Sequence, residues 1–533
     1  MLCYYITVIT PRQLYFTPFS NKSLRSKELP TNRPVTIGSL TPVKFLLALD
    51  AGTTGVRTVA FDDHARAVDT SYRELTQYFP RPGEVEHDSH EIAELAVVTL
   101  REVAQRAFAA GHEVVAIGIT NQRETTVAFD RENGRPAHRA IVWQDRRTAD
   151  RCDEMRNAGH GDLVRTTTGL VLDSYFSATK MRWLLDHGLM DALVTPSFAT
   201  VDSWLLWTLS GGVEDGVFAT EPSNASRTML LDLATRDWSP AMLGLFDIDS
   251  SMLAAVRPSA GRFATVHRSV APELAGVPIT GILGDQQSAL FGQACFDPGV
   301  VKATYGTGAF LLANVGAASP GVFDGLVTSI AWDLGERGAL AYCVEGSAFV
   351  AGAAVQWLRD EMGFIAESNE LEALALSAND SGGVQFVPAF TGLGSPFWRS
   401  DARGSLTGLS RGIRPAQIAR ALVEALAYQV RAMTDAFAQG GITLRELRAD
   451  GGAAAMDLLL QLQATSSRLT VSRSTSLEAT ARGAAMIAGL QAGQWSSLDE
   501  LAELWEFDQR FEPGDPLLVD LGYQAWLRAL AHA

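Results

Sequence analysis

The stretch FLLALDAGTTGVRTVAFD, residues 45–62, joins two apolar runs through an aspartate and a Gly-Thr-Thr-Gly turn. The first run, residues 45–49, is uninterrupted, which is typical of a strand covered on both faces, and the second resumes β-type composition after the turn. The pattern predicts a β-hairpin. Backbone N–H groups at the two glycines and the hydroxyls of Thr53 and Thr54 suit phosphate oxygens, and Asp50 could reach a cation bound to the same phosphates. The alternative is an ordinary glycine turn without a ligand.

A second hairpin of the same plan follows half a chain later, in GVVKATYGTGAFLLAN, residues 299–314. Two such hairpins indicate a duplicated architecture, in which each hairpin begins one α/β domain and the two turns hold a polyphosphate from opposite sides of a cleft. Helical patterns with apolar residues at three- and four-residue steps follow the hairpins, at residues 90–111 and 417–439. A strand ending in Gly-Gly, in LRADGGAAAM at residues 447–456, is a third place where backbone can approach a nucleotide. The alternation of strands and helices predicts an α/β fold.

The bulk properties are those of an ordinary globular protein. The chain has 533 residues, which is too long for one hydrophobic core, and 47% of them are hydrophobic and 20% charged. The net charge of −16 disfavours nucleic acid or an anionic membrane as the main partner, although local backbone dipoles and metal ions can still bind phosphate. The four cysteines lie far apart without CxxC spacing, which favours a reduced, cytoplasmic protein over a zinc site or a disulfide framework. We expect no membrane insertion, because no segment is both long and apolar enough for a membrane helix.

The sequence divides into three parts. Residues 1–42 are rich in basic residues and prolines and are expected to form a disordered N-terminal extension or to result from a misassigned start codon, with a targeting segment as the less favoured alternative. Residues 43–293 contain the first hairpin and are expected to form an N-terminal domain. Residues 294–533 contain the second hairpin and are expected to form a C-terminal domain.

Asp285 is the candidate for the reacting group. It lies in GILGDQQSALFGQ, residues 281–293, after an apolar strand and before the second hairpin, near where the two halves must meet. An aspartate at this place can accept a proton from an attacking hydroxyl and orient that hydroxyl in line with a γ-phosphate, close to a metal ion. The alternative is a helix N-cap without a catalytic role.

Polar and aromatic groups of the first half are candidates for substrate contacts. Arg123 and Glu124 lie between two β-type runs and form an adjacent pair of opposite charges, which can donate and accept hydrogen bonds to vicinal hydroxyls. Such charges more often serve solubility alone. Trp143 ends an apolar strand, Tyr175 precedes a helical pattern, and Phe310 belongs to the second hairpin. Each aromatic residue by itself is more typical of core packing than of a ligand contact.

Several long motifs resemble those of the FGGY family of sugar and polyol kinases, which shares the ribonuclease-H-like ATPase fold with actin, hexokinase and the Hsp70 chaperones. They are LALDAGTT, ITNQRETT, AIVWQDRRT, TGLVLDSYFSATK, NASRTML, GDQQSALFGQ, TYGTGAF, FVPAFTGLGSPFW and ADGGAAAM, spread over about residues 44–525. The resemblance implies two ribonuclease-H-like α/β domains around a central cleft. It also implies phosphorylation of glycerol at a terminal hydroxyl, with ATP and Mg²⁺.

The resemblance implies roles for individual residues as well. Asp285 would be the general base, and Asp50 and Asp285 would hold Mg²⁺, largely through water. Contacts to the hydroxyls and carbon edge of glycerol would come from Arg123, Glu124, Trp143, Tyr175, Asp285, Gln286 and Phe310. Contacts to the phosphates and nucleoside of ATP would come from Asp50, Thr53, Thr54, Gly55, Arg57, Thr307, Gly352, Gln356, Gly452 and Met456. Homologues of this kind often form dimers or tetramers, so the resemblance implies a homodimer or homotetramer.

Two positions depart from the family pattern. Met456 stands where the family usually has an asparagine near the adenine, and a thioether cannot donate the hydrogen bond of that amide. Gly55 stands in place of a serine, which removes one hydroxyl from the phosphate turn. Two alternatives stay open. One is another FGGY kinase, acting on a pentulose, a tetritol or dihydroxyacetone, and the other is a non-catalytic actin-like ATPase.

Overall fold

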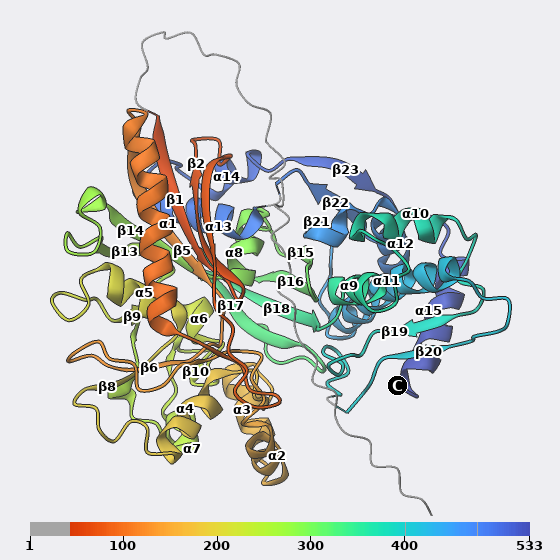
Figure 1. Ribbon diagram of the computed structural model, residues 1–533, viewed down its shortest axis with the longest axis horizontal. Helices are drawn as coiled ribbons and strands as arrows, with labels where there is room; N and C mark the ends of the chain where they lie inside the picture. The colour runs from red at the N-terminus through yellow and green to blue at the C-terminus, as the bar shows by residue number, and fades with distance from the viewer. Residues whose placement is uncertain (1–42, 400, 477) are drawn as a thin grey trace, which may run out of the picture. The chain divides into compact units, whose positions relative to one another are not determined.

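A six-stranded sheet forms the centre of the first half of the chain, in the order β13-β14-β5-β1-β2-β3 (Figure 1). The computed structural model describes residues 43–399, 401–476 and 478–533, so the predicted N-terminal extension lies outside the described residues. The strands of this sheet are β1 (Lys44–Ala51), β2 (Gly55–Phe61), β3 (Ala67–Glu74), β5 (Glu113–Asn121), β13 (Ala260–Thr265) and β14 (Pro278–Gly284).

The predicted first hairpin is confirmed. Strands β1 and β2 are antiparallel, with Leu46 opposite Phe61 and Asp50 opposite Arg57. Seven of the eight residues of β1 are buried, as expected for a strand covered on both faces. Strand β1 is also paired in parallel with β5, which is paired in parallel with β14.

A seven-stranded sheet repeats this plan in the second half, in the order β17-β18-β16-β15-β21-β22-β23. Its strands are β15 (Val300–Tyr305), β16 (Ala309–Gly316), β17 (Val327–Asp333), β18 (Leu340–Ala348), β21 (Glu446–Asp450), β22 (Thr470–Ser474) and β23 (Phe507–Phe511). The second predicted hairpin is β15 with β16, in which Thr304 lies opposite Phe310. In each sheet, two parallel strands continue the sheet beside the first strand of the hairpin. They are β5 and β14 beside β1, and β21 and β22 beside β15. The duplicated α/β architecture is therefore confirmed.

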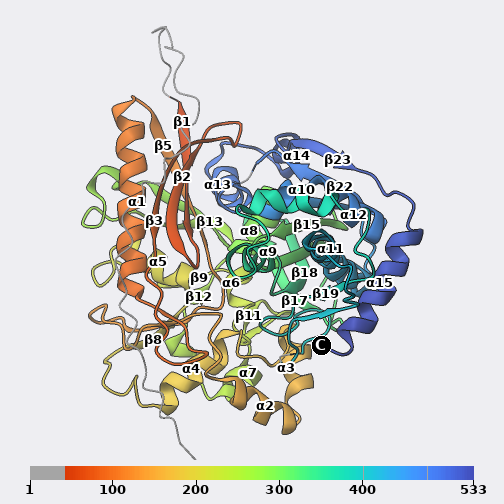
Figure 2. The same ribbon diagram turned by 45° about the vertical axis from the view of Figure 1, so that its right-hand side comes forward.

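Helices cover the outer face of each sheet. Helix α1 (Ser89–Ala109) confirms the helix predicted at residues 90–111 and packs with α5 (Val201–Leu209) on the first sheet, where Figures 1 and 2 both show it. Helix α11 (Pro415–Gln439) confirms the helix predicted at residues 417–439. It shares the apolar core of the second sheet with α9 (Gly352–Asp360), α10 (Leu371–Leu376), α12 (Asp457–Ser467) and α15 (Leu517–Leu530).

Two further helices, α8 (Asp285–Gly292) and α13 (Ala479–Ala492), lie between the two sheets. Their apolar side chains share one core with Leu46 of β1 and Leu312 of β16. Helix α13 belongs to the second half of the chain, yet it packs on β1, β5 and β14 of the first sheet, as Figure 1 shows. The inner layer therefore connects both sheets, and α8 carries Asp285 at its first position.

The close packing of α8 on α13 depends on glycine. A Cβ atom added to Gly483 would lie 1.8 Å from the backbone oxygen of Ser288, so Gly483→Ala must push the helices apart. We expect this overpacking to cost about 1–3 kcal/mol and to outweigh the gain of roughly 1 kcal/mol that alanine brings to a helix interior. Thermal unfolding should show a lowered midpoint. The matched control is Gly244→Ala in α7 (Pro240–Phe246), where an added Cβ meets open space, and its midpoint should stay or rise.

A Gly483→Ala protein that melts no lower than the Gly244→Ala protein would show that the contact between α8 and α13 is not tight.

The connection between β5 and β13 forms a layer of short elements around two apolar cores. These elements are β6 (Val127–Asp130), β7 (Ala140–Ile141), α2 (Ala149–Asn157), α3 (Gly161–Thr168), α4 (Ser177–Asp186), β8 (Pro196–Ala199), β9 (Ala219–Thr220), α6 (Pro222–Ala225), β10 (Leu231–Asp232), β11 (Asp237–Trp238), η1 (Ser250–Met252) and β12 (Ala255–Val256), besides α5 and α7. Elsewhere the chain forms β4 (Glu86–His87), η2 (Pro272–Leu274), η3 (Gly335–Arg337), η4 (Ser368–Glu370), β19 (Gln385–Val387), β20 (Ser405–Thr407), η5 (Gly452–Ala455) and α14 (Leu498–Glu503).

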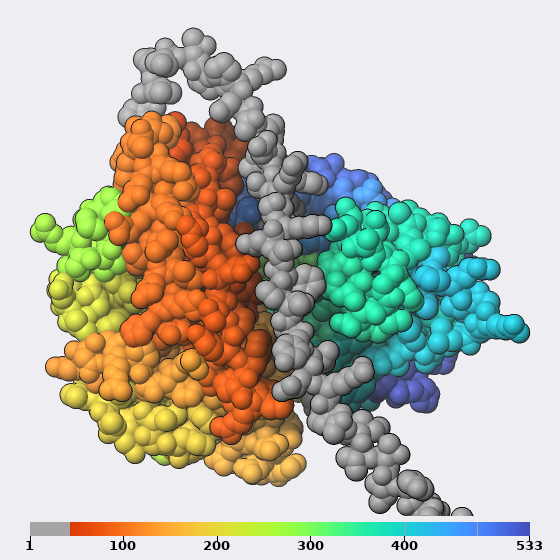
Figure 3. All heavy atoms as spheres, viewed as in Figure 1, coloured from red at the N-terminus to blue at the C-terminus, as the bar shows by residue number. Residues whose placement is uncertain are grey.

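In the space-filling view, the orange and yellow surface of the first half and the blue-green to blue surface of the second half lie on opposite sides (Figure 3). None of the helices in the described residues is both long and apolar enough to span a membrane.

Candidate active site

The carboxyl ends of three parallel strands bring the predicted polar residues together. Strands β1, β5 and β14 are neighbours in the first sheet, and Asp50 lies beside Thr120 near the ends of β1 and β5. Asp285 directly follows β14, and Arg123 and Glu124 follow β5 after one intervening residue, Gln122. Ligands of open α/β sheets bind in the crevice outside the carboxyl ends of the strands, so this edge is the candidate active site.

Asp285 occupies the first position of α8, and Gly284 occupies the N-cap position. The alternative that Asp285 is the helix N-cap is therefore wrong. Its Oδ1 accepts a hydrogen bond of 2.7 Å from the backbone N–H of Gln286. The Asp285 side chain is 28% exposed, and its Oδ1 lies 3.0 Å from Nε of Arg123, whose side chain is only 2% exposed. The carboxylate is thus oriented from the buried side and keeps one open side for a ligand.

Arg123 and Glu124 lie in a turn that directs both side chains to the same side. Successive residues of a strand point to opposite faces. Glu124 breaks this alternation because its φ of +62° is left-handed, a conformation that is uncommon outside glycine. As a result Arg123 Nε and Glu124 Oε1 are 4.0 Å apart. A backbone conformation of this kind costs on the order of 1 kcal/mol and is typical of functional sites.

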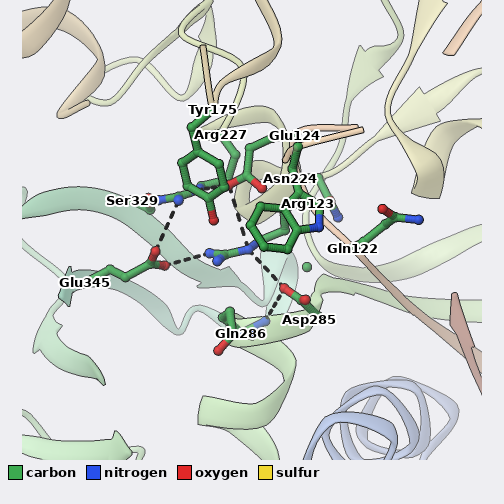
Figure 4. A network of polar contacts seen from close by, with 12 residues as sticks. Gln122, Arg123, Glu124, Tyr175, Asn224, Arg227, Asp285, Gln286, Ser329 and Glu345 are labelled. Carbon is green, nitrogen blue, oxygen red and sulfur yellow. Dashed lines mark hydrogen bonds and ion pairs between the residues drawn. The ribbon is translucent and has the colours of Figure 1, made fainter. Parts of the chain in front are cut away.

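The two residues belong to a buried cluster of four charged side chains, which Arg227 and Glu345 complete (Figure 4). Arg123 Nη1 donates to Glu345 Oε2 at 2.7 Å. Arg227 Nε donates to Glu124 Oε1 at 2.6 Å, and its Nη2 donates to Glu345 Oε1 at 3.2 Å. Burial by itself would raise the pKa of Glu345, but the charges of Arg123 and Arg227 outweigh burial and lower this pKa to about 2. Burial raises the pKa of Glu124 in spite of the charge of Arg227. Of the two carboxylates in the cluster, Glu345 is therefore the one that stays ionised to the lower pH.

Two predicted aromatic residues border this cluster. The rings of Trp143 and Tyr175 meet edge to face with centroids 5.6 Å apart, and the guanidinium carbon of Arg227 lies 5.5 Å from the Tyr175 ring centroid. Burial raises the pKa of the Tyr175 phenol, which therefore stays neutral and able to donate a hydrogen bond. Trp143 Nε1 donates to Thr53 Oγ1 at 2.9 Å, so this ring connects the first hairpin turn to the charged cluster.

The turns of the two hairpins face one cavity of about 1560 Å³. The predicted residues that line this cavity are Thr53, Thr54, Trp143, Gln286, Thr307 and Phe310. The turns therefore converge, as the two hairpin motifs predicted. Gly352 packs behind the second turn, where a Cβ atom would lie 2.6 Å from the backbone oxygen of Gly306.

Asp50 and Asp285 are the predicted magnesium ligands. Asp50 Oδ2 accepts a hydrogen bond of 2.8 Å from Arg57 Nε, and Arg57 Nη1 lies 2.5 Å from Glu478 Oε2. Burial raises the pKa of Asp50, Arg57 opposes this rise, and the charge of Asp285 adds to it. The carboxylate of Asp50 is buried and that of Asp285 is partly exposed, and a hard divalent cation would stabilise two such carboxylates that repel each other. The residues present therefore fit Mg²⁺.

The predicted nucleoside residues do not line the large cavity within the described part of the chain. Gln356 and Gly452 are exposed, whereas Met456 is 7% exposed and packs in the apolar core of the second half. Gly451 precedes this segment with φ of +88°, and a Cβ atom there would lie 2.5 Å from the backbone oxygen of Tyr305. Glycine at this position therefore keeps the strand end close to the second hairpin turn.

Comparison with known proteins places the chain. Models of the FGGY family of carbohydrate kinases match it twice, the N-terminal domain at residues 45–292 and the C-terminal domain at residues 301–492. The chain belongs to the FGGY family of carbohydrate kinases. It is similar to a protein named glycerol kinase from Stenotrophomonas maltophilia, with 46% identity over 92% of this chain and 98% of that protein. The corresponding values for a glycerol kinase from Bordetella parapertussis are 47%, 92% and 97%.

Among solved structures, this FGGY kinase is similar to Plasmodium falciparum glycerol kinase with ADP. The TM-score is 0.86 at 32% identity, over 93% of this chain and 99% of that one. These matches confirm the resemblance and the two-domain α/β kinase fold that the motifs implied.

Sequence reasoning about this FGGY kinase missed three charged residues of the site. Arg227 lies inside the motif NASRTML, yet the motif alone assigns it no partner. Glu345 and Lys302 are charges within apolar strands, and both are completely buried. Lys302 Nζ donates a hydrogen bond to Oε1 of Gln286, a predicted substrate residue. A charged residue in an apolar run does indicate a buried partner, but the sequence does not say which one.

Proposed function

We propose that this carbohydrate kinase transfers the γ-phosphoryl group of ATP to a terminal hydroxyl of glycerol, giving glycerol 3-phosphate and ADP. The observation that carries the proposal is the convergence of Arg123, Glu124 and Asp285 at the strand ends, with Arg123 Nε 3.0 Å from Asp285 and 4.0 Å from Glu124. Donors and acceptors at this spacing suit the vicinal hydroxyls of a small polyol. The names of the similar proteins from Stenotrophomonas maltophilia and Bordetella parapertussis support the choice of glycerol.

Specificity in this proposal comes from buried polar groups. A three-carbon triol offers little apolar area, so a wrong substrate is rejected because it leaves buried donors and acceptors unpaired, at roughly 1–3 kcal/mol each. The proposed hydrogen-bonding residues are Arg123, Glu124, Tyr175, Asp285 and Gln286, and the proposed packing residues on the carbon edge are Trp143 and Phe310.

Asp285 is the proposed general base. Its carboxylate accepts the proton of the attacking hydroxyl, and its open side leaves room for that hydroxyl. Arg123 and the backbone N–H of Gln286 orient the carboxylate. Phosphoryl transfer requires mainly alignment of nucleophile and phosphate and neutralisation of charge, so no covalent nucleophile is needed.

The nucleotide is the second proposed ligand. Its phosphates are held between the hairpin turns by Thr53, Thr54, Gly55, Arg57 and Thr307, and its nucleoside by Gly352, Gln356, Gly452 and Met456. Asp50 and Asp285 would hold Mg²⁺, which would neutralise charge on the phosphates.

The proposed organisation is an N-terminal domain, residues 43–293, with the substrate site, and a C-terminal domain, residues 294–533, with the nucleotide site.

We further propose that the protein is cytoplasmic and forms a homodimer or homotetramer. Light scattering of the purified protein would measure this oligomeric state.

A coupled assay with ATP and Mg²⁺ tests the proposed substrate. We compare glycerol with xylulose, ribulose, erythritol and dihydroxyacetone, and we expect kcat/KM for glycerol to exceed the others by about 100-fold or more, which corresponds to two unpaired polar groups. A preference for a pentulose, erythritol or dihydroxyacetone would identify another substrate within the family. ATP binding without turnover of any polyol would indicate a non-catalytic ATPase.

A further inference from the structure

Glu345 reaches the substrate residues from the opposite sheet. It lies on β18 of the second half, opposite Leu312 of β16 and Val327 of β17 in the register, and none of its side chain is exposed. Its two carboxylate oxygens accept hydrogen bonds from Arg123 and Arg227, which both belong to the first half. Glu345 therefore connects the two halves of the chain at the candidate active site.

Arg227 is the second member of this connection. Its guanidinium donates to Glu124, Glu345 and the hydroxyl of Ser329, the last at 3.0 Å from Nη1. Each of its three nitrogens thus has one partner, and the Arg227 side chain is completely buried. Because these three bonds hold a completely buried guanidinium between Glu124, Ser329 and Glu345, Arg227 orients the carboxylate of Glu124.

Nη1 and Nε of Arg123 have different partners. Nη1 is taken by Glu345 and by Oε1 of Gln287, at 2.7 and 3.1 Å. Nε is buried and forms an ion pair with Asp285 Oδ1 at 3.0 Å, but it donates no hydrogen bond to any described residue. A hydroxyl that accepts from this Nε would lie next to the carboxylate of Asp285. A buried N–H that donates no hydrogen bond is costly, so its presence beside the partly exposed carboxylate of Asp285 supports a ligand-binding role.

We infer that Arg227 and Glu345 are positioning residues for the polyol site. Arg227 holds Glu124 and Glu345 holds Arg123, so that Nε of Arg123 and the carboxylates of Glu124 and Asp285 face the substrate. This inference rests on the proposed function and adds the residues that set substrate affinity. Because Glu345 comes from β18 and Arg123 from the end of β5, the polyol site is complete only when the two sheets are docked at this contact. Neither positioning residue touches the substrate.

The test is Glu345→Gln, which keeps the shape of the side chain and removes its charge. We expect KM for glycerol to rise by about 10- to 100-fold, because a shift of a binding group by about 1 Å can cost that much, with KM for ATP unchanged. A role in stability alone would lower the active fraction and therefore kcat, without moving KM. The matched control is Glu446→Gln on β21 of the same sheet, a carboxylate 3.4 Å from Arg448 and outside the cluster, which should leave both KM values unchanged.

Glu345→Asp should restore part of the affinity, because it returns the charge on a shorter side chain. Should Glu345→Gln fail to fold, Ser329→Ala removes only the hydroxyl that accepts from Arg227, and a smaller rise in KM for glycerol alone is the expected result. The inference is overturned if these variants change KM for glycerol no more than Glu446→Gln does. The wild-type substrate panel is measured first, so a different preferred polyol overturns the proposed substrate, and the KM comparison is then made with that polyol.

Discussion

The Asp285→Asn protein is expected to lose nearly all turnover of glycerol while it still binds ADP. Asparagine has the same shape, and its amide oxygen can still accept from the backbone N–H of Gln286, so the start of α8 should be preserved. It cannot accept the proton of the attacking hydroxyl. Loss of a general base lowers kcat by roughly 100- to 10,000-fold, and loss of a proposed Mg²⁺ ligand adds to this effect.

Steady-state kinetics and calorimetric titration with ADP separate the two parts of this expectation. The matched control is Asp333→Asn at the end of β17, a carboxylate of similar exposure, 20%, that lies 3.6 Å from Arg236 and away from the proposed substrate residues. Its kcat should equal that of the wild type. If Asp285→Asn keeps more than about a tenth of the wild-type kcat, less loss than a general base would cause, Asp285 is not the base.

The elements that the sequence predicted are those whose pattern lies within one short segment of the chain. Each hairpin follows from an apolar run, a glycine turn and a second apolar run in one short segment, residues 45–62 or 299–314, and the structure places them at residues 44–61 and 300–316. The long helices at residues 89–109 and 415–439 likewise follow from the spacing of apolar residues along one segment. Repetition of the hairpin then predicted the duplicated architecture, because a chance turn has no reason to recur.

The parts that the sequence did not predict depend on contacts between distant segments. Glu345 lies 222 residues from Arg123 and 118 residues from Arg227, and nothing in the local pattern of β18 identifies these partners. Helix α13 shows the same limit, because it belongs to the second half and packs on the first sheet. The motif containing Met456 predicted a nucleoside contact, but the burial of this side chain in the core of the second half could only be seen in the structure.

The Arg123→Lys protein is expected to fold and to bind ATP, with kcat/KM for glycerol lowered by roughly 100- to 1,000-fold. The guanidinium makes contacts in two directions, through Nη1 to Glu345 and through Nε beside Asp285. A lysine ammonium is a compact charge that cannot keep both the hydrogen bond to Glu345 and the ion pair with Asp285, and each lost contact with a charged group costs about 1.5–3 kcal/mol. The retained positive charge still balances Glu345, so the cluster is not left with an unpaired buried anion.

Arg123→Met separates the role of charge from the role of geometry. It removes the charge as well, leaving Glu124 and Glu345 to share Arg227, and an uncompensated buried charge costs about 3–5 kcal/mol of folding free energy. We therefore expect thermal unfolding at a clearly lower temperature for Arg123→Met than for Arg123→Lys. Arg448→Lys is the control, since this arginine donates to backbone oxygens of Gln293 and Ala294 outside the site and should leave kcat/KM unchanged. The opposite result would be an Arg123→Lys protein that keeps the wild-type kcat/KM for glycerol. The planar guanidinium of Arg123, with its separate Nη1 and Nε donors, would then have no part in substrate binding, and the positive charge alone would explain why a basic residue is needed here.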